Sequence, residues 1–155
     1  MAASLLGGVV ATAGGLAVRV PMPFDPTMVM WVPDFETSTD RSRAALPTSV
    51  PMSDVVFNVG HTALLVAALA AGDISSLREA TRDRLHQEVR FAIAVPSRAA
   101  HLRALELGAW ASWLSGSGPT VAAMCAADDA ERIASGMPRS EEHTSELQSR
   151  GLISY

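Results

Sequence analysis

The chain has 155 residues, of which 48% are hydrophobic, and it carries a formal net charge of -4 at pH 7. Its length and apolar content predict one soluble globular domain, and the acidic balance without a basic stripe argues against a nucleic-acid partner. The single cysteine, Cys125, excludes an intramolecular disulfide and favours a reducing compartment such as the cytoplasm. The strongest apolar run, residues 62–71, reaches about half of the roughly 20 residues that a membrane span needs, so we expect no membrane partner.

The first third of the chain predicts β structure. Residues 5–20 form two short apolar segments on either side of Gly14 and Gly15, and residues 16–20 alternate as a half-buried strand does. Residues 27–32 predict a further strand because they are rich in Val, Met and Trp and end at a proline. The polar, proline-bounded segment 34–52 predicts a loop with one short helical turn.

Helical patterns follow over 53–72, 73–87 and 96–108. Ser53 is placed as the N-cap of the first helix, whose apolar content leaves little polar face, so we expect it to be buried nearly all round. In the third helix, a proline in the first turn and a terminal glycine are typical boundaries.

The last third predicts strands over 109–114 and 120–125 and a short helix over 130–137. Strands and helices interleave without strict βαβ repetition, which predicts an α+β fold with a sheet and helices packed on one face. Because no strand follows the last helix, we expect the sheet to be incomplete, with an unpaired edge.

The composition changes abruptly at Arg139. Residues 139–155 contain the only tyrosine of the chain, and their order resembles the in-frame translation of a common sequencing adapter. We therefore expect residues 139–155 to be an artefactual, disordered tail, and we exclude them from the fold and the function. A natural acidic tail is the alternative.

A glycine motif, Leu-Ser-Gly-Ser-Gly-Pro-Thr, joins the last two predicted strands at residues 114–120. Two glycines at this spacing let the backbone turn tightly and approach a ligand, and exposed N–H groups in such turns bind phosphate oxygens. Taken alone, the pattern favours an ordinary connecting turn.

Four segments in register resemble one family. Residues 108–123 resemble the third conserved motif of the GHMP small-molecule kinases, which include galactokinase, homoserine kinase and mevalonate kinase. Residues 38–47 are similar to a homoserine kinase segment in which Thr and Arg, four residues apart, precede Leu-Pro. Residues 57–59, with the apolar helix after them, and residues 83–90 also resemble that family. The resemblance covers about residues 5–137.

The resemblance implies the ferredoxin-like C-terminal domain of a GHMP kinase, incomplete at both ends. Residues 1–22 would end a missing N-terminal domain, and residues 23–138 would form the truncated C-terminal domain. It implies phosphoryl transfer from ATP, with Mg²⁺, to the hydroxyl of L-homoserine, a step towards threonine, in a protein that can form a homodimer.

The resemblance also implies site residues. Thr39, Arg43 and Arg90 match residues at the amino-acid site, and a guanidinium fits a carboxylate through two parallel hydrogen bonds. Without the family, exposed surface arginines would be the better interpretation. The expected phosphate-loop-supporting residues are Ser115, Gly116, Ser117, Gly118 and Thr120.

No residue of the chain is expected to act as the catalytic group. His86 neighbours Arg90, but phosphoryl transfer depends mostly on positioning and electrostatics, so we assign it no general-base role. No His or Cys spacing resembles a metal site.

The sequence contains neither the superfamily's ATP-phosphate loop nor a Walker loop. We therefore expect the ATP and Mg²⁺ sites in an absent N-terminal half, and no catalysis by this chain alone. Two alternatives stay open, namely a fragment of another GHMP kinase and a non-catalytic amino-acid-binding module.

Overall fold

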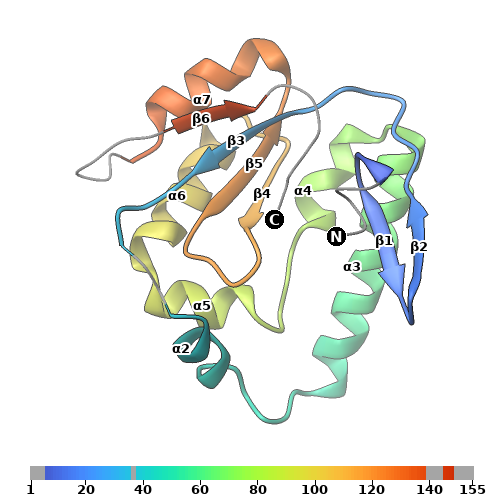
Figure 1. Ribbon diagram of the computed structural model, residues 1–155, viewed down its shortest axis with the longest axis vertical. Helices are drawn as coiled ribbons and strands as arrows, with labels where there is room; N and C mark the ends of the chain where they lie inside the picture. Colours follow the sequence, from blue (N-terminus) through green and yellow to red (C-terminus); the bar gives the residue numbers. More distant parts are fainter. Residues whose placement is uncertain (1–5, 36–37, 139–144, 149–155) are drawn as a thin grey trace.

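The computed structural model describes residues 6–35, 38–138 and 145–148, which form two antiparallel sheets and several helices (Figure 1). A two-stranded hairpin stands beside a four-stranded sheet of order β4-β5-β3-β6. The strands are β1 (Val10–Ala13), β2 (Leu16–Arg19), β3 (Thr27–Trp31), β4 (Ala111–Leu114), β5 (Val121–Cys125) and β6 (Ser145–Gln148).

The helices are α2 (Thr39–Ala44), α3 (Met52–Ala71), α4 (Leu77–Ala80), α5 (Gln87–Ile93), α6 (Val95–Glu106) and α7 (Ala130–Gly136). Two 3-10 turns, η1 (Ile74–Ser76) and η2 (Ala127–Asp129), precede α4 and α7. The predicted α+β class is confirmed.

The central strand β5 separates two hydrophobic cores, because neighbouring residues of a strand face opposite sides of the sheet. Val121, Ala123 and Cys125 point into the first core, which α5, α6 and α7 complete. Met124 points into the second core, where it meets Leu69 of α3 and other apolar side chains. Helices thus pack on one face as expected, and α3 and α4 add a second layer on the other, to the right in Figure 1.

The helix predicted over 73–87 is interrupted. It consists of η1 and α4, followed by a non-helical segment, and α5 begins only at Gln87. The carboxylate of Asp83 accepts hydrogen bonds from the backbone N–H groups of Leu85, His86 and Gln87. In a continuous helix these N–H groups would donate to backbone carbonyls one turn earlier. Here the Asp83 side chain accepts their hydrogen bonds instead, so the first helix ends and a new helix begins after it.

The prediction that the first helix is buried all round was wrong. Of the residues of α3, all of which the structure describes, only Ala68 and Leu69 are buried. Val56 and Val59 are each 65% exposed, and the first half of the helix extends away from the sheets (Figure 1). Ser53 also lies inside the helix rather than at its N-cap, which is Pro51.

Helix α3 also bears on the membrane prediction. Among the helices that the structure describes, α3 alone is long and apolar enough, by length and composition, to cross a membrane. Its side chains Asn58 and His61 form hydrogen bonds to Asp83 and Glu79 of the same domain. These bonds attach one face of the helix to the folded chain.

The sheet was expected to be incomplete, with an unpaired edge, and in the structure strand β6 lies beside β3. Residues 145–148 pair antiparallel with β3, with Met28 opposite Gln148 and Trp31 opposite Ser145. This differs from the expected disordered tail, and the pairing uses backbone groups, which an extended segment of almost any sequence can supply to an open edge. The remainder of residues 139–155 lies outside the described residues, and the origin of this segment stays a prediction.

Candidate functional site

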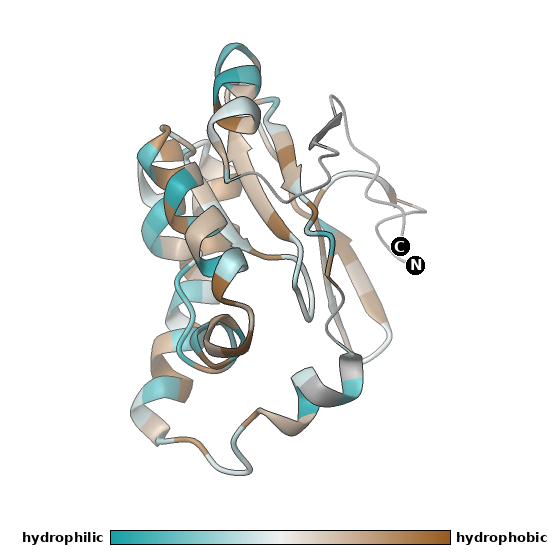
Figure 2. Cartoon of the chain, turned by 90° about the vertical axis from the view of Figure 1, so that its left-hand side faces the viewer, coloured by the Kyte–Doolittle hydropathy of each residue, from teal (hydrophilic) through white to brown (hydrophobic). Residues whose placement is uncertain are grey.

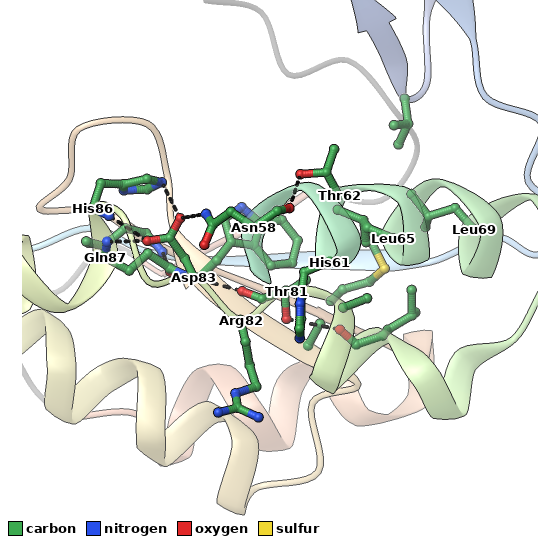
Figure 3. Close-up of a pocket in the computed structure, with 17 residues that line it drawn as sticks. Asn58, His61, Thr62, Leu65, Leu69, Thr81, Arg82, Asp83, His86 and Gln87 are labelled. Atoms are coloured by element: carbon green, nitrogen blue, oxygen red, sulfur yellow. Dashed lines mark hydrogen bonds and ion pairs between the residues drawn. The ribbon is translucent and has the colours of Figure 1, made fainter. Parts of the chain in front are cut away.

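Asp83 is the centre of a hydrogen-bond network that joins α3 to the start of α5 (Figure 3). Its Oδ2 accepts a bond of 2.6 Å from Nδ2 of Asn58, whose Oδ1 accepts from the backbone N–H of Arg84 at 2.9 Å. Burial pushes the pKa of Asp83 upward, but bonds from the backbone of His86 and Gln87 and from Asn58 outweigh it and lower the pKa. The residue is therefore an ionised carboxylate at neutral pH.

His86 connects Asp83 to Arg90. Its Nε2 lies 3.4 Å from Oδ2 of Asp83, and its Nδ1 lies 3.2 Å from Nη1 of Arg90. Because an arginine only donates, Nδ1 must accept, and the ring proton is on Nε2. The pKa of His86 is lowered by burial, which outweighs the attraction of Asp83, and by the charge of Arg90. A neutral ring is the form that this bonding requires.

Arg90 then connects α5 to the glycine loop. Its Nη1 donates a 3.1 Å bond to the carbonyl oxygen of Gly116, which is 26 residues away in sequence. Its Nε is buried and has no hydrogen-bond partner in the described part of the chain. A buried guanidinium nitrogen without an acceptor is costly, so this edge of Arg90 suits an incoming anion.

The glycine loop is a hydrogen-bonded turn between β4 and β5. Ser115 donates its N–H to the carbonyl of Thr120 at 2.9 Å, and Gly118 donates to the carbonyl of Ser115 at 3.1 Å. Gly118 has a φ of +76°, and a Cβ there would lie 2.9 Å from Cδ2 of Leu114. The predicted need for glycine with positive φ is thus met at this position.

Two neighbouring side chains hold the ends of this loop. Ser97 of α6 is buried and donates from Oγ to the carbonyl of Pro119 at 2.6 Å. Gln87, also buried, accepts from the N–H of Leu114 at 2.9 Å and donates from Nε2 to the carbonyl of Thr81. Sequence reasoning assigned no role to Ser97 or Gln87, because neither contact leaves a local pattern.

A cavity of about 320 Å³ lies beside this network, between α3 and the sheet. Asn58, Thr62, Asp83 and His86 supply polar groups to its lining, and Leu65 and Trp113 are among the apolar residues that surround them. An apolar cavity with a few convergent polar groups is the usual form of a small-molecule site.

Of the three predicted amino-acid-site residues, the structure joins only Arg90 to the glycine loop. Arg43 lies on α2 with an exposed side chain, and no hydrogen bond from it is recorded among the described residues. Thr39 begins α2, and its side chain lies outside the described residues. Asn58 and Asp83 occurred in the motifs of the resemblance but were not predicted as site residues. The helix predicted over 73–87 ran through Asp83, so no helix start was expected there, whereas in the structure α5 begins at Gln87 and its N-cap is His86.

The described residues contain no group of three or more His, Cys, Asp or Glu side chains that could hold a metal ion.

The fold and the motifs agree with comparisons to known proteins. The family model "GHMP kinases C terminal" matches residues 65–143. The chain therefore belongs to the GHMP kinase family, and the matched residues include Arg90 and the glycine loop.

Within this family the chain is similar to homoserine kinases. It is 47% identical to the homoserine kinase of Gloeobacter violaceus over 110 residues, which are 71% of this chain and 37% of that protein. It is 40% identical to a homoserine kinase of Thermus thermophilus over 131 residues, or 83% of this chain and 45% of that protein. The chain thus spans less than half the length of these relatives.

Solved structures show the same fold. A homoserine kinase from Cytophaga hutchinsonii superimposes with a TM-score of 0.90 and 24% identity over 97% of this chain and 50% of that chain. L. major mevalonate kinase, solved with R-mevalonate, gives a TM-score of 0.69 and 16% identity over 91% of this chain and 48% of that chain.

Proposed function

We propose that this chain is the C-terminal part of a homoserine kinase, which transfers a phosphoryl group from ATP to the hydroxyl of L-homoserine on the way to threonine. The similarity to curated homoserine kinases supports this substrate over others of the family. The cytoplasm is the compartment that suits a chain with one buried, free cysteine.

The geometry of Arg90 carries the proposal. Its Nη1 is occupied by Gly116 and His86, whereas its buried Nε has no partner in the described part of the chain. A carboxylate is a planar acceptor that can bind this edge, so Arg90 would bind the carboxylate of the amino acid. Arg43 and Thr39, on α2, are proposed as further ligands from their match to the family motif.

The glycine loop would take part through its connection to Arg90. The loop receives bonds from Arg90 at Gly116 and from Ser97 at Pro119, so its backbone has little freedom. A loop that is already ordered loses little conformational entropy when a ligand binds. The loop would therefore hold its own residues beside the nucleotide phosphates, namely Ser115, Gly116, Ser117, Gly118 and Thr120. ATP supplies the phosphoryl group when bound, and its principal site is expected outside this chain.

The test uses the complete protein encoded by the natural reading frame and a coupled assay for ADP release. We expect turnover with L-homoserine and little with mevalonate or galactose, and no turnover with the 155-residue chain alone. Preference for another acceptor would assign the protein to a different branch of the family. Turnover by the isolated chain, scaling with its concentration, would contradict the proposed division of the active site.

Calorimetric titration distinguishes the non-catalytic alternative. An amino-acid-binding module predicts that the isolated chain binds L-homoserine at a defined stoichiometry and that the complete protein has no kinase activity.

A further inference from the structure

His86 and Arg90 lie one turn apart on the same face of α5. His86 is the N-cap of this helix, and the backbone N–H of Arg90 donates to the carbonyl oxygen of His86 at 3.1 Å. Side chains four residues apart on a helix are neighbours, and here Nδ1 of His86 lies 3.2 Å from Nη1 of Arg90. The imidazole ring is therefore placed to act on the guanidinium that we propose as the carboxylate ligand.

Two acceptors fix the direction of this guanidinium. Nη1 of Arg90 carries two N–H groups, and the acceptors beside it are Nδ1 of His86 and the carbonyl oxygen of Gly116, at 3.2 and 3.1 Å. Because a guanidinium is planar, holding one nitrogen at two points sets the direction of the other nitrogens. The buried Nε, which has no hydrogen-bond partner among the described residues, is thereby oriented before an anion arrives.

His86 can accept this bond in only one protonation state. Nδ1 is an acceptor while the ring is neutral and its proton is on Nε2. Asp83 favours that tautomer, because its Oδ2 lies 3.4 Å from Nε2, and Asn58 holds the carboxylate through a bond of 2.6 Å. In a protonated ring both nitrogens are donors, so Nδ1 loses its bond to Arg90 and two positive charges stand side by side.

Few other charged groups surround His86 in the described part of the chain. Across the cavity lie His61 of α3 and Arg82, and both of these side chains bond to Glu79. The glycine loop consists of Ser, Gly, Pro and Thr, so it carries no ionisable side chain, and it is pale in the hydropathy colouring of Figure 2. The side chain of His86 is 38% exposed, so protons reach the ring from the solvent.

We propose that His86 is a positioning residue, which in its neutral form holds Arg90 in place for the carboxylate of the amino-acid substrate and releases it when the ring is protonated. This inference rests on the proposed function, because it takes Arg90 as the carboxylate ligand. It makes substrate binding depend on pH between about 5 and 7, although the carboxylate of the substrate stays ionised throughout this range.

Steady-state kinetics of the complete protein with L-homoserine tests the role of His86. The folded pKa of His86 is below 6.5, chiefly because of burial, so the ring gains its proton as the pH falls below that value. Between about pH 7.5 and 5.5, KM for homoserine should rise roughly threefold or more, with little change in KM for ATP.

Two substitutions of His86 separate positioning from a merely structural role. His86→Asn keeps an acceptor at the place of Nδ1, does not titrate, and supplies a favoured N-cap residue. It should keep a nearly normal KM at the upper end of the pH range and lose the rise at the lower end. His86→Ala removes the acceptor, so it should raise KM for homoserine about three- to tenfold at every pH.

His101→Gln is the matched control. The pKa of His101 is also lowered, chiefly by burial, but this residue belongs to α6 and its ring stacks on Phe91. The control should keep the rise in KM of the wild type. A rise that persists in His86→Asn, or a KM that falls with the pH, would overturn the inference and leave homoserine as the substrate. Absence of homoserine turnover at any pH would instead contradict the proposed function.

Nitrogen-15 NMR of the complete protein tests the link without any substrate. The Nε–H signal of Arg90, assigned by its absence in Arg90→Lys, should shift through the titration of His86 in the wild type and stay constant in His86→Asn. The ring signals of His86 should show the proton on Nε2 at neutral pH. A signal of Arg90 that does not follow His86 would overturn the inference, whatever the substrate. A signal that does follow it, in a protein that does not phosphorylate homoserine, would support the positioning of Arg90 for another anion.

Discussion

Nη1 of Arg90 donates a 3.1 Å hydrogen bond to the carbonyl oxygen of Gly116. This bond links the residue proposed to bind the substrate carboxylate directly to the glycine loop. A displacement of Arg90 should therefore shift the position of Gly116, and a displacement of Gly116 should shift that of Arg90. Substrate binding at Arg90 and the position of the loop are thus expected to be coupled in the complete enzyme.

The first prediction concerns Arg90 in the complete protein. We expect Arg90→Ala to lower kcat/KM for homoserine by about 30- to 1,000-fold, because a desolvated charge-assisted pair contributes roughly 2 to 4 kcal/mol to transition-state binding. Arg90→Lys should recover only part of this loss, since an ammonium lacks the planar fork. Arg43→Ala is expected to have an effect of the same order, with little change in KM for ATP.

Steady-state kinetics measures these effects, and Arg103→Ala on α6 is the matched control. Arg103 is an exposed arginine that bonds to Gly136 and Glu106, away from the glycine loop. Near-normal homoserine kinetics in both Arg90→Ala and Arg43→Ala would end the assignment of these residues.

The second prediction concerns Asp83, whose carboxylate accepts three backbone N–H bonds and one from Asn58. Asp83→Ala should lower the free energy of unfolding by about 2 to 4 kcal/mol, because it leaves several of these donors unpaired. Asp83→Asn keeps an acceptor and should cost less. Urea denaturation of the complete protein measures both, and an unchanged midpoint for Asp83→Ala would contradict the capping role.

Acid unfolding gives Asp83 a distinct signature. Its folded pKa is below the ordinary 3.8, so its contribution is present above that pH and is lost as the pH falls through the folded pKa. In Asp83→Asn, the loss of stability below about pH 4 should therefore be shallower than in the wild type.

The third prediction concerns His86. Burial and the charge of Arg90 hold its folded pKa below 6.5, so the unfolded chain binds the proton at a higher pH than the folded chain does. Stability should then fall as the pH is lowered from about 7 towards 5. His86→Gln should show a smaller fall. Some dependence should remain, because the pKa of His101 is also lowered, chiefly by burial.

Denaturation curves at several pH values between about 5 and 7 provide the measurement. An identical pH dependence in the wild type and in His86→Gln would mean that His86 keeps the same pKa in the folded and unfolded chains.

The fourth prediction separates two glycines of the same loop. Gly118→Ala should destabilise the protein by about 1 to 3 kcal/mol, because φ is positive and the new Cβ would collide with Leu114. Gly116→Ala has a positive φ but open space around the Cβ, so it should cost only about 1 kcal/mol. Thermal unfolding of the two variants compares them, and equal losses would show that the contact with Leu114 relaxes freely.

The fifth prediction concerns residues 139–155. From their adapter-like order, we expect genomic DNA from the source to encode a different sequence after Pro138, with a natural strand beside β3 in place of residues 145–148. Recovery of the same seventeen residues from independent genomic DNA would reject this expectation.

The sequence by itself determined the local elements. The strands predicted over 27–32, 109–114 and 120–125 correspond to β3, β4 and β5, because residue type and bounding turns specify such segments locally. The helix predicted over 96–108 corresponds to α6 for the same reason. The glycine positions of the loop also followed from the chain, since only glycine tolerates the backbone angle of Gly118 without strain.

Tertiary structure decided the rest. The break at Asp83 depends on a side chain that competes with backbone carbonyls, and propensity does not record that competition. The exposure of α3 depends on which elements lie beside it. Its apolar composition alone therefore predicted burial on all sides, which the structure does not show. The bonds from Arg90 to Gly116 and from Gln87 to Leu114 join residues that are far apart in the chain. Only the packing of α5 against the end of β4 brings these groups within hydrogen-bonding distance, and this packing creates the candidate site.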